Sequence, residues 1–359
     1  MDGGVISKKP SVTSSQVADH AGVSQSAVSR TFTPGASISP KTRAKVLAAA
    51  KELGYRPNAI ARSLITSRSR IIAVVMAYLE NLFYPDVLEE LGRRLSAENY
   101  HVLLFTGFKD RDSDPVFDQL MQYRVDGIIL ASTSLSSQLS EECTVAGIPV
   151  VLFNRTTEKN TASSVTSRNR EGGRLLADFL VAGGHKSFGY IAGLESSSTN
   201  RDRFGGFRDG LKAAGFDKIE VRTGNYNRTD AEAAARELLS LKKRPQAIFV
   251  ANDHMAVAVM DVARFEFGLS IPDDLSIVGY DDVGPARWPS YGITSVTQPI
   301  IPMVEATVDI LMDQIASGEI EPQHKVIAGE LIVRTSARLP RKGIVERDGV
   351  KFYKPPGTR

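Results

Sequence analysis

The sequence predicts a small all-α head followed by an α/β body made of two doubly wound parallel-sheet lobes. The first observation is charge: residues 1–70 hold eleven Lys and Arg against three acids, whereas the whole 359-residue chain has a net charge of only +3. The second is that short helical patterns with capping residues fill this basic segment. The third is that apolar runs alternate with amphipathic stretches from Ile71 onward, as in parallel sheets covered on both faces.

Composition restricts the class of protein further. Hydrophobic residues make up 42% and charged residues 24% of the chain, which is an ordinary globular profile. No apolar run reaches the roughly 18 residues that span a bilayer. The N-terminus lacks the apolar core and cleavage site of a secretion signal, and the single Cys143 cannot form an internal disulfide. We therefore expect a cytoplasmic protein without a membrane partner.

Three short helices are expected in the head. Thr13 opens a capping box for the first helix, because its hydroxyl can accept from the third helical N–H. Ser24 can cap the second helix, with Val28 turned inward. Ser39 and Pro40 begin the third helix, which runs to Gly54. Its expected apolar stripe is Val46, Leu47, Ala50 and Leu53.

The second helix has small hydrogen-bonding side chains on its outward face. A helix-turn-helix needs such a helix in the major groove of DNA, where Gln25 and Ser26 can contact base edges. Arg30 can donate two hydrogen bonds to guanine, and Ser24 and Ser29 suit phosphates. The alternative is an ordinary packed helical pair with a solvated Arg30. The basic excess, the caps and the turn together favour DNA binding.

A linker is expected after the third helix. Residues 58–70 are too polar and too few to own a core, although Asn58 can cap a short helical stretch that ends at Leu64. We expect this stretch to fold only with help.

In the body, polar residues follow several strand-like runs. Ligands of doubly wound folds bind beyond the carboxyl ends of the strands. Carboxylates, amides and guanidinium groups there suit a polyhydroxylated ligand. A helix cap is an equally good role for Asn252 by itself. The residues in question are Asn154 with Arg155, Arg203, Asn252 with Asp253, and Asp281 with Asp282.

Enzyme chemistry has little support in the sequence. The five histidines are scattered without metal-ligand spacing, and Cys143 precedes a strand as a structural thiol would. No glycine-rich phosphate loop is present. We expect no catalytic residues, no metal ligands and no cofactor.

Two segments carry a family resemblance. VTSSQVADHAGVSQSAVSRTF, followed by ISPKTRAKVLAAAKELGYRPNAIARSL, resembles the N-terminus of the lactose-repressor (LacI/GalR-type) family of bacterial transcription regulators. The likeness extends to about Leu339. It implies a body of the periplasmic-binding-protein type and a hinge helix, NAIARSL, that forms on operator DNA and inserts Leu64 into the minor groove. The expected DNA-contacting residues are Thr13, Ser24, Gln25, Ser26, Ser29, Arg30, Asn58, Arg62 and Leu64.

The resemblance also implies an effector site between the lobes. Four family positions match here: the Arg of RxxGF, the Asn of AND, the first Asp of GYDD and the aromatic after TGN. Arg155 lies where relatives vary, and together with Arg203 it would favour an acidic or phosphorylated sugar if both face the cleft. The expected effector-binding residues are Arg155, Arg203, Tyr226, Asn252 and Asp281.

These patterns predict a homodimeric repressor of carbohydrate-utilisation genes that binds a near-palindromic operator. Its effector would be a small sugar, sugar acid or sugar phosphate. The alternative is a sugar-binding protein of the periplasmic type, which the basic head disfavours. Activation, a tetramer and the effector's identity stay open. The expected domains are 1–57 (helix-turn-helix), 58–70 (hinge), 71–345 (body) and 346–359 (polar tail), with an N-lobe of about 71–169 and 300–328 and a C-lobe of about 170–298 and 329–345.

Overall fold

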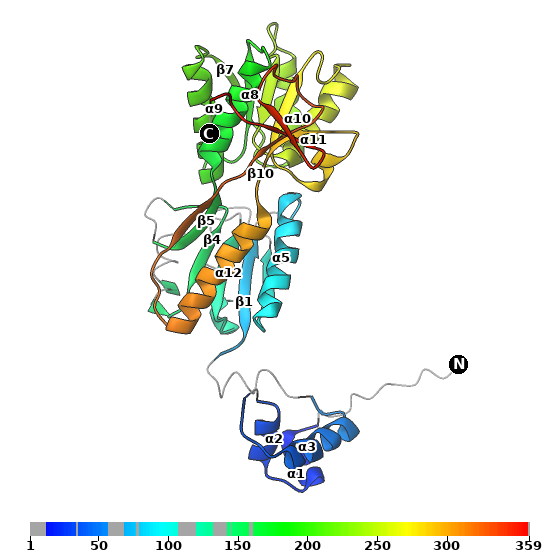
Figure 1. Ribbon diagram of the computed structural model, residues 1–359, viewed down its shortest axis with the longest axis vertical. Coiled ribbons are helices and arrows are strands. Elements are labelled where there is room, and N and C mark those ends of the chain that lie inside the picture. Colours follow the sequence, from blue (N-terminus) through cyan, green and yellow to red (C-terminus); the bar gives the residue numbers. More distant parts are fainter. Residues whose placement is uncertain are drawn as a thin grey trace, which may run out of the picture. The chain divides into compact units, whose positions relative to one another are not determined.

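The computed structural model describes residues 12–33, 35–56, 68–76, 79–106, 120–131, 142–143, 145–157 and 161–357. The chain divides into two compact units, Met1–Ser69 and Arg70–Arg359, which we call the head and the body. Figure 1 shows the elements of each unit. The predicted hinge residues Asn58, Arg62 and Leu64 lie outside the described residues. Within the described part, no helix has the length and apolarity needed to cross a membrane.

The head consists of α1 (Ser14–Ala21), α2 (Gln25–Thr31) and α3 (Pro40–Leu53), each started by the expected cap. The Thr13 capping box is present: its hydroxyl accepts from the Gln16 N–H at 3.3 Å, and the Gln16 side chain accepts from the Thr13 N–H at 2.9 Å. The three helices enclose a small apolar core centred on Val17, Val28 and Val46.

The expected apolar stripe of α3 was wrong at one position. Leu47 is 47% exposed, and Ala49 is buried in its place. Val46, Ala49, Ala50 and Leu53 follow the i, i+3, i+4, i+7 spacing of a single helix face. Leu47 lies beside that face, so its apolar side chain stays in solvent.

Two sheets form the body and confirm the predicted fold class. The N-lobe sheet is entirely parallel, in the order β2-β1-β3-β4-β5-β11. Its strands are β1 (Ile71–Met76), β2 (His101–Thr106), β3 (Gly127–Ala131), β4 (Val150–Phe153), β5 (Ser163–Ser167) and β11 (His324–Ile327). The helices α5 (Phe83–Ala97) and α12 (Ile300–Ser317) lie side by side against it (Figure 1).

The C-lobe sheet has the order β7-β6-β8-β9-β10-β12-β14-β13. Its strands are β6 (Phe188–Ala192), β7 (Ile219–Thr223), β8 (Ala247–Val250), β9 (Ser276–Asp281), β10 (Thr294–Thr297), β12 (Leu331–Val333), β13 (Ile344–Arg347) and β14 (Val350–Tyr353). The accompanying helices are α8 (Asn169–Ala182), α9 (Ser198–Ala213), α10 (Arg228–Leu239) and α11 (Asp253–Asp261), with a π-turn at Val262–Glu266 and a 3₁₀ turn at Gly284–Arg287.

Strand order explains where a ligand site can form. In each lobe the second strand pairs on one side of the first and the third strand on the other, so the chain changes direction beside the first strand. This switch leaves a crevice at the carboxyl ends of the strands. The chain crosses between the sheets after β5, after β10 and after β11, so the two crevices belong to one body.

Close packing of α8 on α9 fixes one wall of that region. A Cβ on Gly173 would lie 2.0 Å from the carbonyl oxygen of Arg203, and a Cβ on Gly206 would lie 1.8 Å from that of Arg170. The two helices therefore touch backbone to backbone, which only glycine permits. This contact fixes the position of α9 and of the side chain of Arg203.

The polar segment 346–359, expected as a tail separate from the body, instead contributes to the C-lobe sheet. β13 and β14 form a hairpin that extends the C-lobe sheet by pairing antiparallel with β12. Asp348 and Gly349 take φ values of 50° and 76° at its turn, as the Asp-Gly pair of a tight hairpin allows. Tyr353 is buried, with its ring 5.3 Å from that of Phe179. The tail reads as polar because most of its side chains face solvent.

Candidate functional sites

The outward face of α2 carries the side chains predicted to contact DNA. Gln25, Ser26, Ser29 and Arg30 are exposed, whereas Val28 is fully buried in the head core. Thr13 is exposed too, but its hydroxyl already takes part in the capping box. The helix thus separates a packing face, which contributes to the head core, from an exposed polar face.

Local hydrogen bonds orient the start of this face. The Gln25 amide donates to Ser14 Oγ at 2.9 Å, and the hydroxyls of Ser24 and Ser26 lie 2.9 Å apart. Among the residues that the structure describes, Arg30 forms no ion pair. Its exposed guanidinium can therefore donate to a partner outside the head.

In the body, all five predicted effector residues line one polar pocket between the lobes. Arg155 follows β4 in the N-lobe, while the other four lie on the C-lobe. Nine buried residues line the pocket: Asn81, Tyr84, Asn154, Arg155, Thr199, Arg203, Tyr226, Asn252 and Asp281. Its side chains leave about 10 Å³ free, roughly the space of one water. A larger ligand therefore requires the side chains or lobes to move.

An ion pair forms the floor of the polar pocket. Arg203 Nη2 lies 3.0 Å from Asp281 Oδ1, and the guanidinium stacks 3.7 Å from the centre of the Tyr280 ring. Asn169 and the Ala251 carbonyl accept two more of its hydrogen bonds, at 2.8 and 2.6 Å. Burial raises the pKa of Asp281, and the guanidinium opposes that rise by favouring the carboxylate. The structure thus uses most of Arg203 to build the pocket.

Arg155 bridges the two lobes. Its Nη1 donates to Thr199 Oγ1 at 2.8 Å and to the carbonyl of Asn154 at 2.9 Å. The next residue continues the bridge, because the Thr156 N–H donates to Ser198 Oγ at 3.1 Å. These contacts hold the N-lobe strand end against the first turn of α9.

Asn252 acts as a helix cap, and its side chain also has a donor without a partner in the described part of the chain. Its Oδ1 caps α11 by accepting from the Met255 N–H at 3.0 Å. Its Nδ2 is buried without a partner in the described part of the chain, and so is Oδ1 of Asn154. Buried polar atoms rarely stay unpaired. One donor and one acceptor are therefore unsatisfied at the edge of this pocket.

Backbone strain concentrates here. Tyr226 has φ 58° and Asp281 has φ 108°, values that non-glycine residues rarely adopt. With Asn154, Asn225 and Asp282, five of the nine non-glycine residues with positive φ in the described chain lie at or beside the pocket. Strain of this kind clusters at functional sites.

Gly193 makes room for the aromatic wall, because a Cβ there would lie 2.1 Å from the ring of Tyr226. The Tyr226 ring can therefore pack directly on the backbone of residue 193 because that residue is glycine.

Sequence reasoning missed four of the nine lining residues as candidates. Asn81 and Tyr84 follow β1 at the start of α5, and Thr199 lies one turn before Arg203 on α9. Asn154 is among the polar residues expected after strands, but it is not among the expected effector-binding residues. The usable signal for Asn81 and Tyr84 was position: they follow a buried strand, as the chosen residues do.

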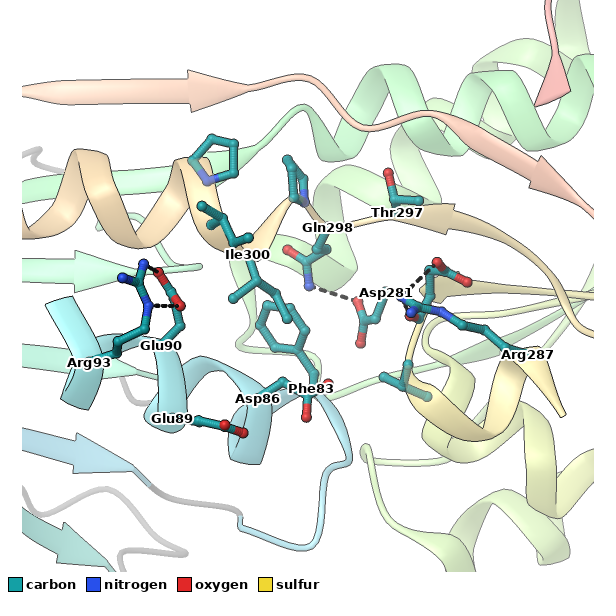
Figure 2. A pocket seen from close by; sticks show the side chains of 15 residues that line it. Phe83, Asp86, Glu89, Glu90, Arg93, Asp281, Arg287, Thr297, Gln298 and Ile300 are labelled. Carbon is teal, nitrogen blue, oxygen red and sulfur yellow. Dashed lines mark hydrogen bonds and ion pairs between the residues drawn. The ribbon is translucent and has the colours of Figure 1, made fainter. Parts of the chain in front are cut away.

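A second, larger pocket of 580 Å³ adjoins the first and shares Asp281 with it (Figure 2). Its walls are α5, the start of α12 and the segment after β9. Figure 2 shows carboxylates of Asp86 and Glu89 on one wall and the apolar Phe83 and Ile300 between the walls. This pocket differs in chemistry from the polar one.

Comparison with known proteins now gives the family. Residues 15–58 match the family described as bacterial regulatory proteins, lacI family, and residues 177–337 match the periplasmic binding protein-like domain. The chain is 33% identical over 333 residues to the HTH-type transcriptional regulator CelR of Thermobifida fusca, covering 90% of this chain and 98% of CelR. It belongs to the LacI family. This LacI-family protein is a DNA-binding transcriptional regulator with a helix-turn-helix head.

Other relatives agree with this assignment. The repressor PurR of Yersinia enterocolitica is 31% identical over 329 residues, covering 90% of this chain and 96% of PurR. A structure of the CelR–cellobiose complex has a TM-score of 0.69 at 31% identity, covering 91% of this chain and 100% of that one. The lac repressor dimer bound to operator and the anti-inducer ONPF has a TM-score of 0.80 at 27% identity, covering 91% and 99%.

Proposed function

We propose that this LacI-family regulator is a homodimeric repressor of carbohydrate-utilisation genes and works in the cytoplasm, where its DNA lies. Two copies of α2 contact the half-sites of a near-palindromic operator. A small sugar-like effector binds the polar pocket between the lobes and controls operator affinity. The relatives support this: the lac repressor was solved as a dimer on its operator, and CelR with cellobiose.

The observation that carries the effector half is the convergence of side chains at the strand ends. Arg203 and Asp281 form a fixed polar floor, Tyr226 supplies an aromatic wall, and Asn252 presents a buried donor that has no partner among the described residues. Fork-shaped donors, carboxylates and amides match vicinal hydroxyls, and a ring face covers C–H groups. We propose binding here without turnover, since the relatives are regulators.

The DNA half rests on the exposed face of α2. Gln25, Ser26 and Arg30 contact base edges in this proposal, while Ser24, Ser29 and Thr13 contact the phosphates that set the helix in the groove. Asn58, Arg62 and Leu64 form the hinge that bends the operator centre, which is a proposal from the sequence alone.

Coupling between the sites follows from the bridge between the lobes. An effector shifts the population of lobe arrangements only through its different affinity for each of them. A complete switch between repressed and released states needs about 5.5 kcal/mol of such difference. An effector that replaces the contact between Arg155 and Thr199 acts on one of two hydrogen bonds by which the residues after β4 contact the start of α9.

Operator selection from random duplexes with the full-length protein tests the function. Candidate sugars, sugar acids and sugar phosphates are then titrated into the selected complex. A near-palindrome released by one compound supports the proposal. No enriched sequence, with ligand binding intact, favours the sugar-binding-protein alternative. A palindrome bound only in the presence of ligand makes the compound a co-repressor.

A further inference from the structure

We propose that the effector carries a single anionic group, a carboxylate or a phosphate, and that Arg155 binds it. The effector is then a hydroxyl-rich acid rather than a neutral sugar. This inference rests on the proposed function of the polar pocket and adds the charge of its ligand.

The charge balance of the pocket is the first step. Its nine lining residues include two guanidinium groups, Arg155 and Arg203, and one carboxylate, Asp281. Asp281 pairs with Arg203 at 3.0 Å and also accepts from the Gln298 amide at 2.7 Å. Arg203 is therefore paired within the pocket wall, whereas Arg155 forms no ion pair among the described residues, and the lining keeps one net positive charge.

Arg155 is buried, and no carboxylate of the described residues forms an ion pair with it. Its exposed fraction is 8%. Both of its hydrogen bonds leave from Nη1, and both acceptors are neutral: a hydroxyl of Thr199 and the carbonyl of Asn154. Desolvating a cation is costly unless an opposite charge compensates it. An anion at Nε and Nη2 would supply that charge through a bidentate pair.

Neighbouring acids do not provide it. Asp282 pairs with Arg334 at 2.6 Å and with Arg287 at 3.1 Å, so its charge is already balanced. Asp253 does not line the pocket, and its carboxyl accepts from the Ser295 hydroxyl at 2.8 and 2.9 Å. Burial raises the pKa of Asp253 well above its usual range, which favours the uncharged form.

The adjoining 580 Å³ pocket is the wrong place for the anion. Asp86 and Glu89 face it without an ion-pair partner in the described chain. Its two cations are occupied, since Arg93 pairs with Glu90 and Arg287 with Asp282 (Figure 2). Carboxylates along α5 repel an anion there. The anionic group therefore belongs at Arg155, and uncharged parts of the ligand can extend toward Asp281.

The hydroxyl-rich part of the ligand has its own partners. Asn252 Nδ2 is a buried donor and Asn154 Oδ1 a buried acceptor, and neither has a partner in the described chain. A hydroxyl both donates and accepts, so vicinal hydroxyls can satisfy both atoms. Asn154 and Arg155 are adjacent, which places the acceptor beside the anion-binding group.

Matched pairs of ligands test the charge directly. The panel holds D-glucose with D-gluconate, D-glucuronate and glucose 6-phosphate, and the corresponding pairs for galactose, xylose and cellobiose. Binding to the full-length protein is measured by calorimetry, and release of the selected operator by fluorescence anisotropy. An acid that binds at least 10-fold tighter than its neutral partner supports the proposal, and its identity separates carboxylate from phosphate.

Two variants assign the preference to Arg155. We expect Arg155→Met to weaken the acid about 10- to 100-fold and to leave the neutral partner nearly unchanged, as loss of a charge-assisted pair predicts. Arg155→Lys should restore part of the affinity because it keeps the charge but not the fork. Arg287→Met removes a cation from the adjoining pocket and should leave the preference for the acid intact.

Several outcomes would overturn the inference. They are tightest binding by a neutral sugar, a panel in which no acid binds, and an equal loss of acid and neutral affinity in Arg155→Met. In each case operator selection can still succeed, so the regulator stands while the charge assignment fails. If operator selection failed while the acid still bound, the charge assignment would stand and the proposed regulatory function would fail.

Discussion

The head and the body present their functional side chains in opposite ways. On α2 the polar residues are exposed, and Arg30 has no ion-pair partner in the described chain. In the polar pocket of the body every lining residue is buried, and Arg203 and Asp281 are bonded to each other. One site is a surface ready to meet a partner, and the other is already closed on itself.

This difference suggests how each site tolerates change. Each side chain on α2 acts nearly alone, because the head's core packs on the opposite face of the helix. The polar pocket is held by packing, ion pairs and strained backbone, so its residues depend on elements that never touch a ligand. Damage to the head should therefore be local, and damage to the body should spread.

The largest expected effect is the loss of operator binding when the head is removed from the body. Deletion of residues 1–69 should abolish operator binding and leave effector affinity unchanged, because the head and the body have separate cores. A mobility-shift assay and calorimetry on the same preparation measure both. Loss of effector binding in a folded deletion protein would show that the body depends on the head.

A methyl group added at the contact between α8 and α9 should disturb the polar pocket of the body. Gly206→Ala places a Cβ 1.8 Å from the Arg170 carbonyl, so α8 and α9 must separate and Arg203 must move. We expect the free energy of unfolding to fall by about 1–3 kcal/mol, as in other overpacked contacts, together with a clear loss of effector affinity. Urea unfolding and calorimetry measure the two effects.

The neighbouring glycine is the matched control. A Cβ on Gly205 meets only the flexible end of the Arg170 side chain, at 2.9 Å. Gly205→Ala should gain helix propensity without forcing the backbones apart. If both variants bound effector like the wild type, the pocket would not depend on the packing of these two helices.

Much of this contrast was predictable from sequence. Caps, helical spacing and strand-like runs are local signals, and they predicted α1–α3 and the two sheets. Residues after strands were expected to converge, and Arg203 and Asp281 do. Their pairing joins positions far apart in sequence, so only the closed fold shows that Arg203 is neutralised and Arg155 is not.

The misses have physical causes as well. Asn81 and Tyr84 lie in the pocket because α5 begins beside the end of β1, a tertiary relation that side-chain type does not encode. The C-terminal hairpin was overlooked because its exposed residues are polar, although Asp348-Gly349 between two short β-prone runs is a hairpin signal.

In the head, a single substitution should change specificity without changing stability. Arg30→Ala should cost about 1–3 kcal/mol of binding at one base pair and relax the choice of base there. Its exposed side chain packs on no core, so the unfolding transition should stay in place. Operator variants at each position, measured by anisotropy, map the loss.

Lys45→Ala on α3 is the control for simple loss of positive charge, because Lys45 is also exposed. Any loss in that variant should be equal on all sequences and should reduce the salt dependence. The same uniform loss in Arg30→Ala would make Arg30 a phosphate contact and not a base contact.

The smallest expected effect is a pH dependence of the free energy of unfolding that arises from a buried histidine of the body. His185 is fully buried between the Leu180 carbonyl and Ser276 Oγ, each 2.8 Å from a ring nitrogen, and burial lowers its pKa. Histidine in the unfolded chain has a pKa near 6.5, so below that pH it binds a proton that the folded protein does not yet bind at His185. As the pH is lowered, the free energy of unfolding should therefore decrease by up to about 1.4 kcal/mol per pH unit, until the pKa of His185 in the folded protein is reached.

The variant His185→Gln isolates this contribution, because glutamine can donate to Leu180 and accept from Ser276 but cannot titrate. Urea unfolding of both proteins between pH 7.5 and 5 should give a shallower slope for the variant, even if it is less stable at pH 7.5. His254 has a pKa lowered by burial too, so some slope remains in the variant. Parallel slopes would mean that His185 titrates alike in both states. In that case the buried polar groups of the body would be less shielded from protons than their packing indicates, and the contrast with the exposed face of α2 would weaken.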